Sequence, residues 1–239
     1  MPKTIAVLGA GTGLGRSVAR RFGQEGYRVA LVARTTSRLD ALVTELQGEG
    51  IEAAWFATDL GERQELPGLL EKITARFGRL DVVEYAPSGL VWLDVQTGVL
   101  DADVGSFEYP LDLLLRTPVA LARLLLPAMI ERGDGGLLFG LPVTASVPYP
   151  QIANVGTAAA AARAYFHNLN VGLASTGVYA GLVQVAGMVA GSESARHFIQ
   201  TRDPATLPEP LDPQRLADAY WDLFTKRDSF EQIVGAAGQ

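Results

Sequence analysis

Residues 8–16, LGAGTGLGR, are the part of this sequence whose residue types and spacing most clearly suggest chemistry. They follow an apolar run, residues 5–8, and precede a segment in which Val18 and Phe22 have helical spacing. A glycine-rich turn between a strand and a helix is the context in which such turns bind dinucleotides. Glycines permit positive φ and a close approach of phosphate, and the helix N-terminus offers free N–H groups to a diphosphate. The alternative is a tight turn with no ligand.

The end of the second predicted strand indicates which dinucleotide would bind. Residues 27–33, YRVALVA, predict this strand, and Arg34, Thr35 and Arg38 follow it. An acidic residue here would bind a free ribose 2′-hydroxyl, whereas arginine suits a 2′-phosphate. The sequence therefore favours NADP(H) over NAD(H). The alternative is a solvated, basic helix start before Leu39.

The third predicted strand, residues 52–58, ends at Asp59 and Leu60. Because parallel strands end at the same edge of a sheet, Asp59 is expected near the adenine. Its carboxylate can accept a hydrogen bond from the adenine amino group. It can equally cap a helix that begins near Glu62. Both interpretations stay open.

Strands and helices alternate along the chain. Further helices are predicted at residues 39–50, 66–77, 111–131, 157–174 and 216–224, and further strands at 80–85, 137–141, 178–186 and 230–234. The Thr117-Pro118 step is expected to perturb the long helix. The pattern predicts an α/β fold, in which a doubly wound parallel sheet with helices on both faces forms one domain over residues 1–239.

Composition narrows the class of partner. The chain has 239 residues, a formal charge of −6 and no basic stripe, which argues against nucleic-acid and membrane-surface partners. It has no cysteine and only two histidines, so disulfides and a metal site are not expected. No secretory signal is visible, and charges or prolines interrupt every apolar run. We expect a soluble, cytoplasmic protein with a small-molecule ligand.

The order and spacing of these pieces resemble the short-chain dehydrogenase/reductase family over nearly the whole chain. Gly9, Gly13 and Gly15 match the three glycines of its cofactor motif, Arg34 its NADP-selecting arginine and Asp59 its adenine-contacting aspartate. Residues 80–83 (LDVV) match the start of its fourth strand, and residues 186–187 (AG) resemble its Pro-Gly pair, with the proline missing.

This resemblance implies a Rossmann-type NADP(H) site and a lid over the substrate at about residues 188–213. It also implies a homodimer or homotetramer that pairs through the helices at 111–131 and 157–174. The residues expected to contact the cofactor are Gly9, Thr12, Gly13, Leu14, Gly15, Arg34, Thr35, Arg38, Asp59, Leu60, Ala86, Pro87 and Gly187.

The catalytic positions of the family are not kept. Its tyrosine protonates the developing alkoxide, a lysine four residues later lowers the tyrosine pKa, and a serine and an asparagine complete the tetrad. Continuing without a gap from residues 148–153 places the tyrosine at Val155 and the lysine at Ala159. The serine of the family would then fall near Pro142 and its asparagine at Leu114. The chain has no lysine between Lys72 and Lys226, so no shift of register restores the motif. The standard proton transfer is therefore expected to be absent.

Other residues could replace the proton donor. The weak candidates are Tyr149, Tyr85, Thr144 and Ser146, each of which also has an ordinary packing or turn-forming interpretation. Glu84 is a candidate acid only if burial raises its pKa. His167 and His197 are expected to have packing or surface roles.

The apolar residues at these positions predict a cleft for a hydrophobic ligand, or a cleft that packing has closed. Its lining would be Leu114, Pro142 and Val155 with Leu90, Trp92 and Met188. Three functions remain open. They are a divergent NADP(H)-dependent oxidoreductase, a protein that binds NADP(H) without turnover, and a non-redox enzyme that reuses the cleft.

Overall fold

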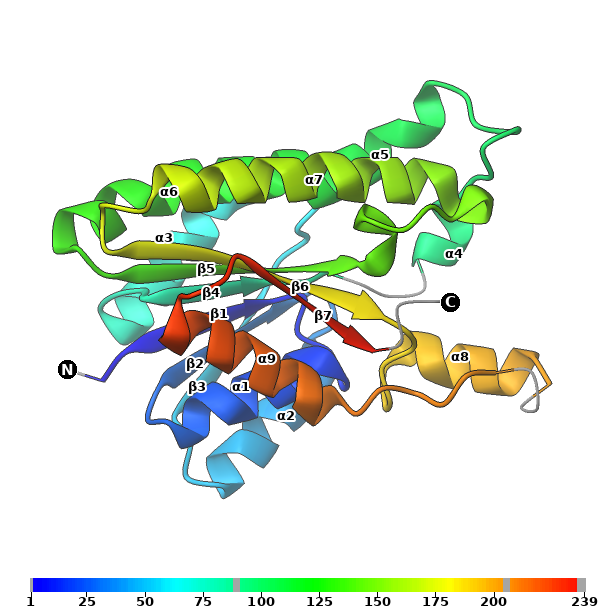
Figure 1. Ribbon diagram of the computed structural model, residues 1–239. Coiled ribbons are helices and arrows are strands. Elements are labelled where there is room, and N and C mark those ends of the chain that lie inside the picture. Colours follow the sequence, from blue (N-terminus) through cyan, green and yellow to red (C-terminus); the bar gives the residue numbers. More distant parts are fainter. Residues whose placement is uncertain (1, 88–90, 204–206, 236–239) are drawn as a thin grey trace.

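A seven-stranded, fully parallel sheet forms the centre of the computed structural model, which describes residues 2–87, 91–203 and 207–235 (Figure 1). The strand order is β3-β2-β1-β4-β5-β6-β7. The strands are β1 Thr4–Leu8, β2 Arg28–Ala33, β3 Ala53–Ala57, β4 Val82–Tyr85, β5 Gly135–Pro142, β6 Val178–Ala186 and β7 Glu231–Gly235. The order reverses between β1 and β4, the kind of switch point at which such sheets bind ligands.

Helices cover both faces of this sheet, as predicted from the sequence (Figure 1). On one face lie α1 (Leu14–Gln24), α2 (Thr36–Gly48) and α9 (Pro213–Lys226), and on the other lie α3 (Leu66–Phe77), α6 (Thr117–Arg132) and α7 (Ala153–Gly172). Shorter helices are α4 (Val91–Val95), α5 (Glu108–Leu111) and α8 (Glu193–Thr201). The remaining helical turns are η1 Arg63–Glu65, η2 Gly105–Phe107, η3 Asp112–Arg116, η4 Val143–Ala145 and η5 Pro150–Ile152.

Burial on both faces explains the composition of the strands. All five residues of β1 are buried, so this strand is a continuous apolar run instead of an alternating one. Against β5 and β6, the small side chains of α7 allow close packing: Ala158, Ala159 and Ala162 are fully buried. Phe166 of α7 stacks on Phe139 of β5 with the ring centroids 3.7 Å apart.

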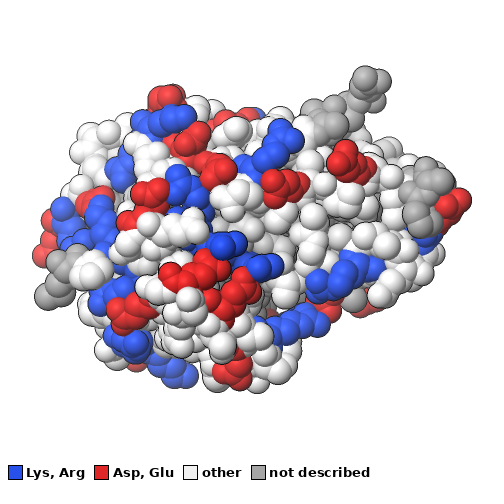
Figure 2. All heavy atoms as spheres, turned by 90° about the horizontal axis from the view of Figure 1, so that it is seen from below, with Lys and Arg blue, Asp and Glu red and all other residues white. Residues whose placement is uncertain are grey.

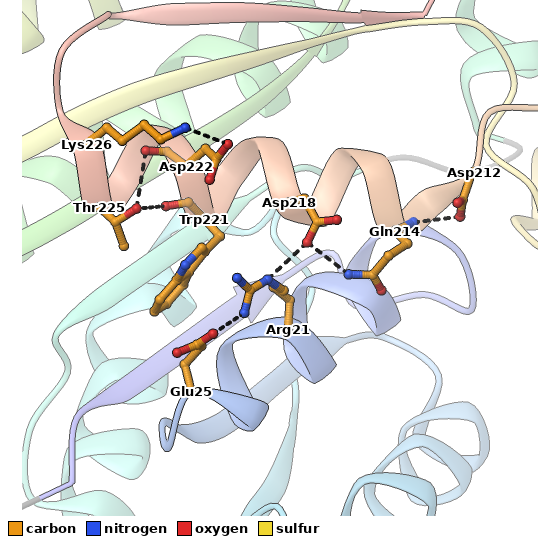
Figure 3. Close-up of polar contacts among 9 residues, drawn as sticks. All are labelled: Arg21, Glu25, Asp212, Gln214, Asp218, Trp221, Asp222, Thr225 and Lys226. Carbon is orange, nitrogen blue, oxygen red and sulfur yellow. Dashed lines mark hydrogen bonds and ion pairs between the residues drawn. The ribbon is translucent and has the colours of Figure 1, made fainter.

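Polar contacts join α1 to α9 along the outside of the sheet (Figure 3). Arg21 lies between the two helices, with its Nε 3.0 Å from Oδ1 of Asp218 and an ion pair to Glu25 on its own helix. Its guanidinium also lies over the ring of Trp221. Asp212 caps α9 by accepting the backbone N–H of Gln214 at 2.9 Å. The last helix is therefore held on the first, which carries the glycine turn.

Charges of both signs are interspersed on the face that these helices form (Figure 2). Arg16 pairs with Glu45 and Arg20 with Glu49, in each case between α1 and α2. Because the two signs are mixed, the face shown has no extended area of positive potential.

Most predicted elements lie within a few residues of those observed, and the bounds predicted for α3 and β6 are the observed ones. The π-helical turn η3 falls directly before the Thr117-Pro118 step, as expected for a perturbed helix. Pro118 has no N–H to donate to the carbonyl of Leu114, which favours a widened turn there. The helices α4 and α8 were not predicted.

The run Gly105–Arg132 is helical and, by length and composition, apolar enough to cross a membrane. The sequence predicts that charges or prolines interrupt every apolar run, yet this helix continues through Pro118 and Pro127. Its apolar side chains Leu121, Leu125 and Met129 pack into the core between the sheet, α3 and α7. This packing is typical of a core helix.

Candidate cofactor and catalytic site

The glycine turn after β1 leaves no room for side chains. Gly9 has φ +101°, and a Cβ there would lie 2.7 Å from Cα of Pro87. At Gly15, a Cβ would lie 2.9 Å from Cα of Ala10. Positive φ and close backbone approach are the two conditions that require glycine. The turn therefore passes directly against the end of β4, as a dinucleotide turn must.

The N-terminus of α1 opens onto the same edge of the sheet. Its first residue is Leu14, and its N-cap Gly13 supplies no side chain to cap the helix. The N–H groups of the first turn lack helical acceptors and carry the positive end of the helix dipole, which together favour an anion. Thr12, Gly13, Leu14 and Gly15 are thus brought together in the arrangement that the sequence predicted.

The adenosine end of the predicted site carries Arg34 and Arg38. Arg34 is largely exposed, and its Nη1 lies 3.8 Å from Oδ2 of Asp59. Asp59 also accepts the backbone N–H of Gly61 at 2.9 Å, so it stabilises its own turn. Thr35 is the N-cap of α2 and does not use its hydroxyl to cap it. Leu60 is buried.

Arg38 forms an ion pair with a residue from a distant part of the chain. Glu193, the first residue of α8, accepts two hydrogen bonds from the Arg38 guanidinium, at 2.9 Å and 2.7 Å. The bonds to Arg38 hold the pKa of Glu193 below its usual value, and they raise the pKa of Arg38. Only an arginine near the end of β2 was visible in the sequence; its partner lies 155 residues away.

The segments after β4 and β6 complete this edge. The backbone N–H of Ala86 donates to the carbonyl of Leu8 at 3.1 Å, which places Ala86 and Pro87 beside the glycine turn. Gly187, with φ +156°, follows β6, and a Cβ there would lie 3.2 Å from Cγ of Leu211. These three residues therefore lie at the same edge of the sheet as the glycine turn.

The four family catalytic positions hold no group that can exchange a proton. Leu114, Val155 and Ala159 are 2, 5 and 0% exposed and belong to the core between the sheet, α6 and α7. Pro142 is the last residue of β5. These side chains are apolar and closely packed, and the absence of the standard proton relay stays a prediction.

Two of the candidate substitutes have other partners. The hydroxyl of Tyr85 donates to the carbonyl of Leu113 at 2.6 Å in the buried core, and burial raises its pKa well above the usual value. Ser146 donates to Oε1 of Gln184 at 2.7 Å, and Gln184 continues to Glu231. Both hydroxyls thus already have acceptors.

The other two candidates differ in exposure. Tyr149 is 54% exposed and lies just before η5. Thr144 lies in η4, and its Oγ1 is a buried atom with no hydrogen-bond partner among the described residues. A Cβ on Gly156 would lie 3.5 Å from Cβ of Thr144, so this hydroxyl-bearing residue contacts α7 next to Val155. Thr144 is therefore the candidate whose hydroxyl is buried beside α7 without a hydrogen-bond partner among the described residues.

Glu84 meets the condition on its pKa but lies on the other face of the sheet. Burial raises its pKa to about 8. Its strand neighbours Val82 and Val7 belong to the core under α1 and α9, whereas Val155 and Leu114 belong to the opposite core. The sheet thus separates this carboxyl group from the catalytic positions.

The two histidines pack against aromatic rings. His167 stacks on Phe230 with centroids 4.5 Å apart, and His197 contacts Phe198 edge to face. Within residues 2–87, 91–203 and 207–235, no group of three metal-ligating side chains occurs.

Asn154, beside Val155, has a structural role that the sequence did not reveal. Its amide donates to the carbonyls of Val95 and Ser106, and its Oδ1 accepts the N–H of Thr97, each at 2.8 Å. This buried side chain fixes the segment from α4 to η2, where Trp92 packs edge to face on Tyr109. Of the expected cleft lining, Leu90 lies outside the described residues.

An apolar groove of about 540 Å³ lies elsewhere, between α3 and α6. Leu70 and Leu124 line its walls, and Arg79 and Leu80 lie just before β4. The groove is therefore at the edge of the sheet where strands begin, opposite the glycine turn.

Comparison with known proteins agrees with this geometry. The family model of short chain dehydrogenases matches residues 3–201. A short chain dehydrogenase of Pseudocercospora fijiensis is 30% identical over 176 residues, which cover 74% of this chain and 56% of that protein. The chain thus spans little more than half the length of this relative.

Two solved structures show the same fold. An actinorhodin polyketide ketoreductase with NADPH has a TM-score of 0.83 at 21% identity, covering 98% of this chain and 95% of that one. A short chain oxidoreductase from Pseudomonas aeruginosa PAO1, described as containing an atypical catalytic center, has a TM-score of 0.85 at 16% identity and covers 99% and 97%. With the family model matching most of its length, this chain belongs to the short-chain dehydrogenase/reductase family.

Proposed function

We propose that this protein binds NADP(H) in preference to NAD(H) and acts as an oxidoreductase on a hydrophobic or activated small molecule, with a degenerate catalytic tetrad. The observation that carries this proposal is that one edge of the sheet has a polar, arginine-bearing end and an apolar end. Arg34 and Arg38 lie beside the glycine turn at one end, and apolar residues such as Val155 fill the catalytic positions at the other. The NADPH bound to the similar ketoreductase supports the choice of cofactor.

The residues present fit such a cofactor. Gly9, Gly13 and Gly15 bring no side chains to the turn, α1 presents its N-terminus, and arginine is suited to a 2′-phosphate. The bound dinucleotide supplies hydride transfer, and the protein supplies position and exclusion of water.

The missing tetrad limits the reaction. A positioned general acid is worth about 10²- to 10⁴-fold in rate, and an oxyanion donor about 10²- to 10³-fold. Positioning of the substrate still contributes. The favoured substrate is therefore one that needs little protonation as hydride arrives, such as an activated double bond, and not an ordinary ketone.

We assign the hydroxyl group of Thr144 to the substrate end of this site. Its Oγ1 is buried without a partner among the described residues, and it lies against α7 beside the position of the missing tyrosine. It would hold a polar atom of the substrate and would not act as an acid, because a threonine hydroxyl does not ionise near neutral pH.

A second function, binding of NADP(H) without turnover, is favoured by the close packing of the catalytic positions. Leu114 and Ala159 are buried in the core and leave no polar group to take part in a reaction. A non-redox enzyme that reuses the cleft is the third reading, and it would need no nicotinamide.

Titration with NADPH and NADH, followed by nicotinamide fluorescence, tests this proposal. We expect NADPH to bind at least tenfold more tightly than NADH, and Arg34→Gln to remove most of the difference. Arg20→Gln is the matched control, because Arg20 pairs with Glu49 on the outside of α1 and α2. Failure to bind either nucleotide would exclude both NADP(H) functions, and equal binding would contradict the role of Arg34.

Turnover then separates the two NADP(H) functions. The protein is incubated with NADPH and each member of a panel of ketones, enones and imines, and oxidation of NADPH is followed by its absorbance. Oxidation with enones or imines and none with simple ketones is the result expected for the oxidoreductase. Tight binding with no oxidation across the panel would favour the non-catalytic function.

Several properties expected from the sequence or from the family resemblance stay predictions. These are a substrate lid at residues 188–213, assembly into a homodimer or homotetramer, and a cytoplasmic location. Light scattering measures the assembly directly.

A further inference from the structure

Residues 191–196, from the end of the β6 loop into α8, lie across the glycine turn. The hydroxyl of Thr12 donates to the carbonyl of Gly191 at 2.7 Å. Arg196 donates to the same carbonyl at 2.6 Å and to Oγ1 of Thr12 at 3.1 Å. A Cβ on Gly13 would lie 3.1 Å from Cβ of Ser192. This segment therefore contacts the part of the chain that would receive the diphosphate.

Glu193 fastens the same segment at the adenosine end. Its two carboxylate oxygens accept a bidentate pair from Arg38, at 2.9 Å and 2.7 Å. Two parallel N–H···O bonds are also how an arginine holds a phosphate. Arg34 and Arg196 are close enough to act on the Glu193 carboxylate electrostatically. One carboxylate thus stands among three arginines where the 2′-phosphate is expected.

We propose that Glu193 is a specificity-determining residue, an internal anion that competes with the 2′-phosphate of NADP(H) for Arg38 and fastens α8 over the glycine turn until that phosphate takes its place. This inference rests on the proposed function, because it assumes an NADP(H) site at this edge.

The strength of the ion pair suits such an exchange. The side chains of Arg38 and Glu193 are 48% and 37% exposed, and ion pairs of this exposure contribute little to stability. A phosphate monoester carries nearly two charges, against one on the carboxylate, so it is the stronger partner for arginine. NAD(H) has no such group and leaves Arg38 bonded to Glu193.

Calorimetric titration with 2′,5′-ADP and 5′-ADP tests the competition without requiring any reaction. We expect Glu193→Gln to tighten binding of 2′,5′-ADP about three- to tenfold and to change that of 5′-ADP less than about twofold. Glu49→Gln is the matched control. It likewise removes a carboxylate that is paired with an arginine, because Glu49, just after α2, pairs with Arg20 of α1 away from the adenosine end. This control is expected to change neither affinity.

A double-mutant cycle with Arg38→Gln separates competition from a general effect of charge. If Glu193 acts through Arg38, the gain from Glu193→Gln disappears when Arg38 is already replaced. A gain that persists in that background would overturn the proposal, as would equal binding of 2′,5′-ADP by the wild type and Glu193→Gln. If the wild type binds neither 2′,5′-ADP nor NADPH, the proposed function itself fails.

Limited trypsin digestion tests the fastening of α8. Cleavage after Arg196 and Arg202, within and just after α8, is expected to be faster in Glu193→Gln than in the wild type, and unchanged in Glu49→Gln. In the wild type, 2′,5′-ADP should speed this cleavage relative to 5′-ADP. Cleavage rates that are the same in Glu193→Gln and the wild type would overturn the fastening role.

Discussion

Glu84 on β4 and Tyr220 on α9 place a carboxyl group and a phenol in the same buried layer beneath the sheet. Neither Oε1 of Glu84 nor the hydroxyl oxygen of Tyr220 has a hydrogen-bond partner among the described residues, and the charge of Glu84 raises the pKa of Tyr220 further than burial alone. The family resemblance gives this carboxyl group no role. Its burial makes it a source of pH-dependent stability.

Stability is predicted to fall as pH rises, because of Glu84. Burial raises its pKa from 4.5 to about 8, so the folded protein binds a proton that the unfolded chain releases between these values. The free energy of unfolding should therefore decrease by up to about 1.4 kcal/mol per pH unit from pH 4.5 to 8, and level off above. In Glu84→Gln this decrease should be absent, leaving the variant about 3 to 5 kcal/mol more stable than the wild type at pH 8.

Urea unfolding at several pH values measures this effect. Glu71→Gln, on the exposed side of α3, removes the same charge and should keep the wild-type pH dependence. A parallel pH dependence in Glu84→Gln and the wild type would contradict the prediction.

Asn154→Ala should destabilise the protein by about 2 to 4 kcal/mol, because it removes a buried side chain and leaves the part-buried groups at Val95, Thr97 and Ser106 without their partner. Asn168→Ala is the control within the same helix. Its amide bonds only the carbonyl of Ala164 at an exposed site, so the change should stay within about 0.5 kcal/mol. Urea midpoints that coincide for the two variants would show that Asn154 does not fix the α4–η2 segment.

Gly9→Ala is expected to lose about 2 to 3 kcal/mol of stability and to weaken NADPH binding at least tenfold. The residue needs φ +101°, and the added methyl group would meet Pro87 at 2.7 Å. Gly48→Ala, at the end of α2, meets nothing within 4 Å and should be neutral or stabilising by up to about 1 kcal/mol. Thermal unfolding and nucleotide titration of the pair measure both effects, and equal losses would refute the steric argument.

Thr144→Val should raise KM for a turned-over substrate about 5- to 20-fold with a smaller change in kcat, because the hydroxyl is assigned to hold the substrate and not to transfer a proton. NADPH affinity should not change. Tyr85→Phe and Tyr149→Phe are the comparison variants, since the first hydroxyl is bonded to Leu113 and the second residue is largely exposed. If either of these lowers kcat more than Thr144→Val does, the assignment of Thr144 is wrong.

Local patterns were sufficient to predict most of the fold. Apolar runs such as residues 178–186 define strands by themselves, because a strand covered on both faces is mostly apolar along its length. The helix α8 was missed because it is short and polar, with a single fully buried side chain, Ala195. Its position depends on contacts with distant residues, which periodicity does not record.

The site was predicted unevenly for the same reason. The glycine turn and Arg34 follow directly from chain order, since β1 and β2 end at one edge and their loops must lie there. The partners of polar side chains could not be read from the sequence. The sequence does not distinguish Tyr85 and Ser146 from Thr144, whereas the folded chain bonds the first two hydroxyls to Leu113 and Gln184.

The sequence by itself determined the family, the parallel sheet and the glycine turn, because each of these depends on residue type and order along the chain. Only the tertiary structure decided that Glu84 lies across the sheet from the catalytic positions and that Glu193 meets Arg38. A residue's partner and its face of the sheet depend on how distant segments pack, and packing is a property of the folded molecule.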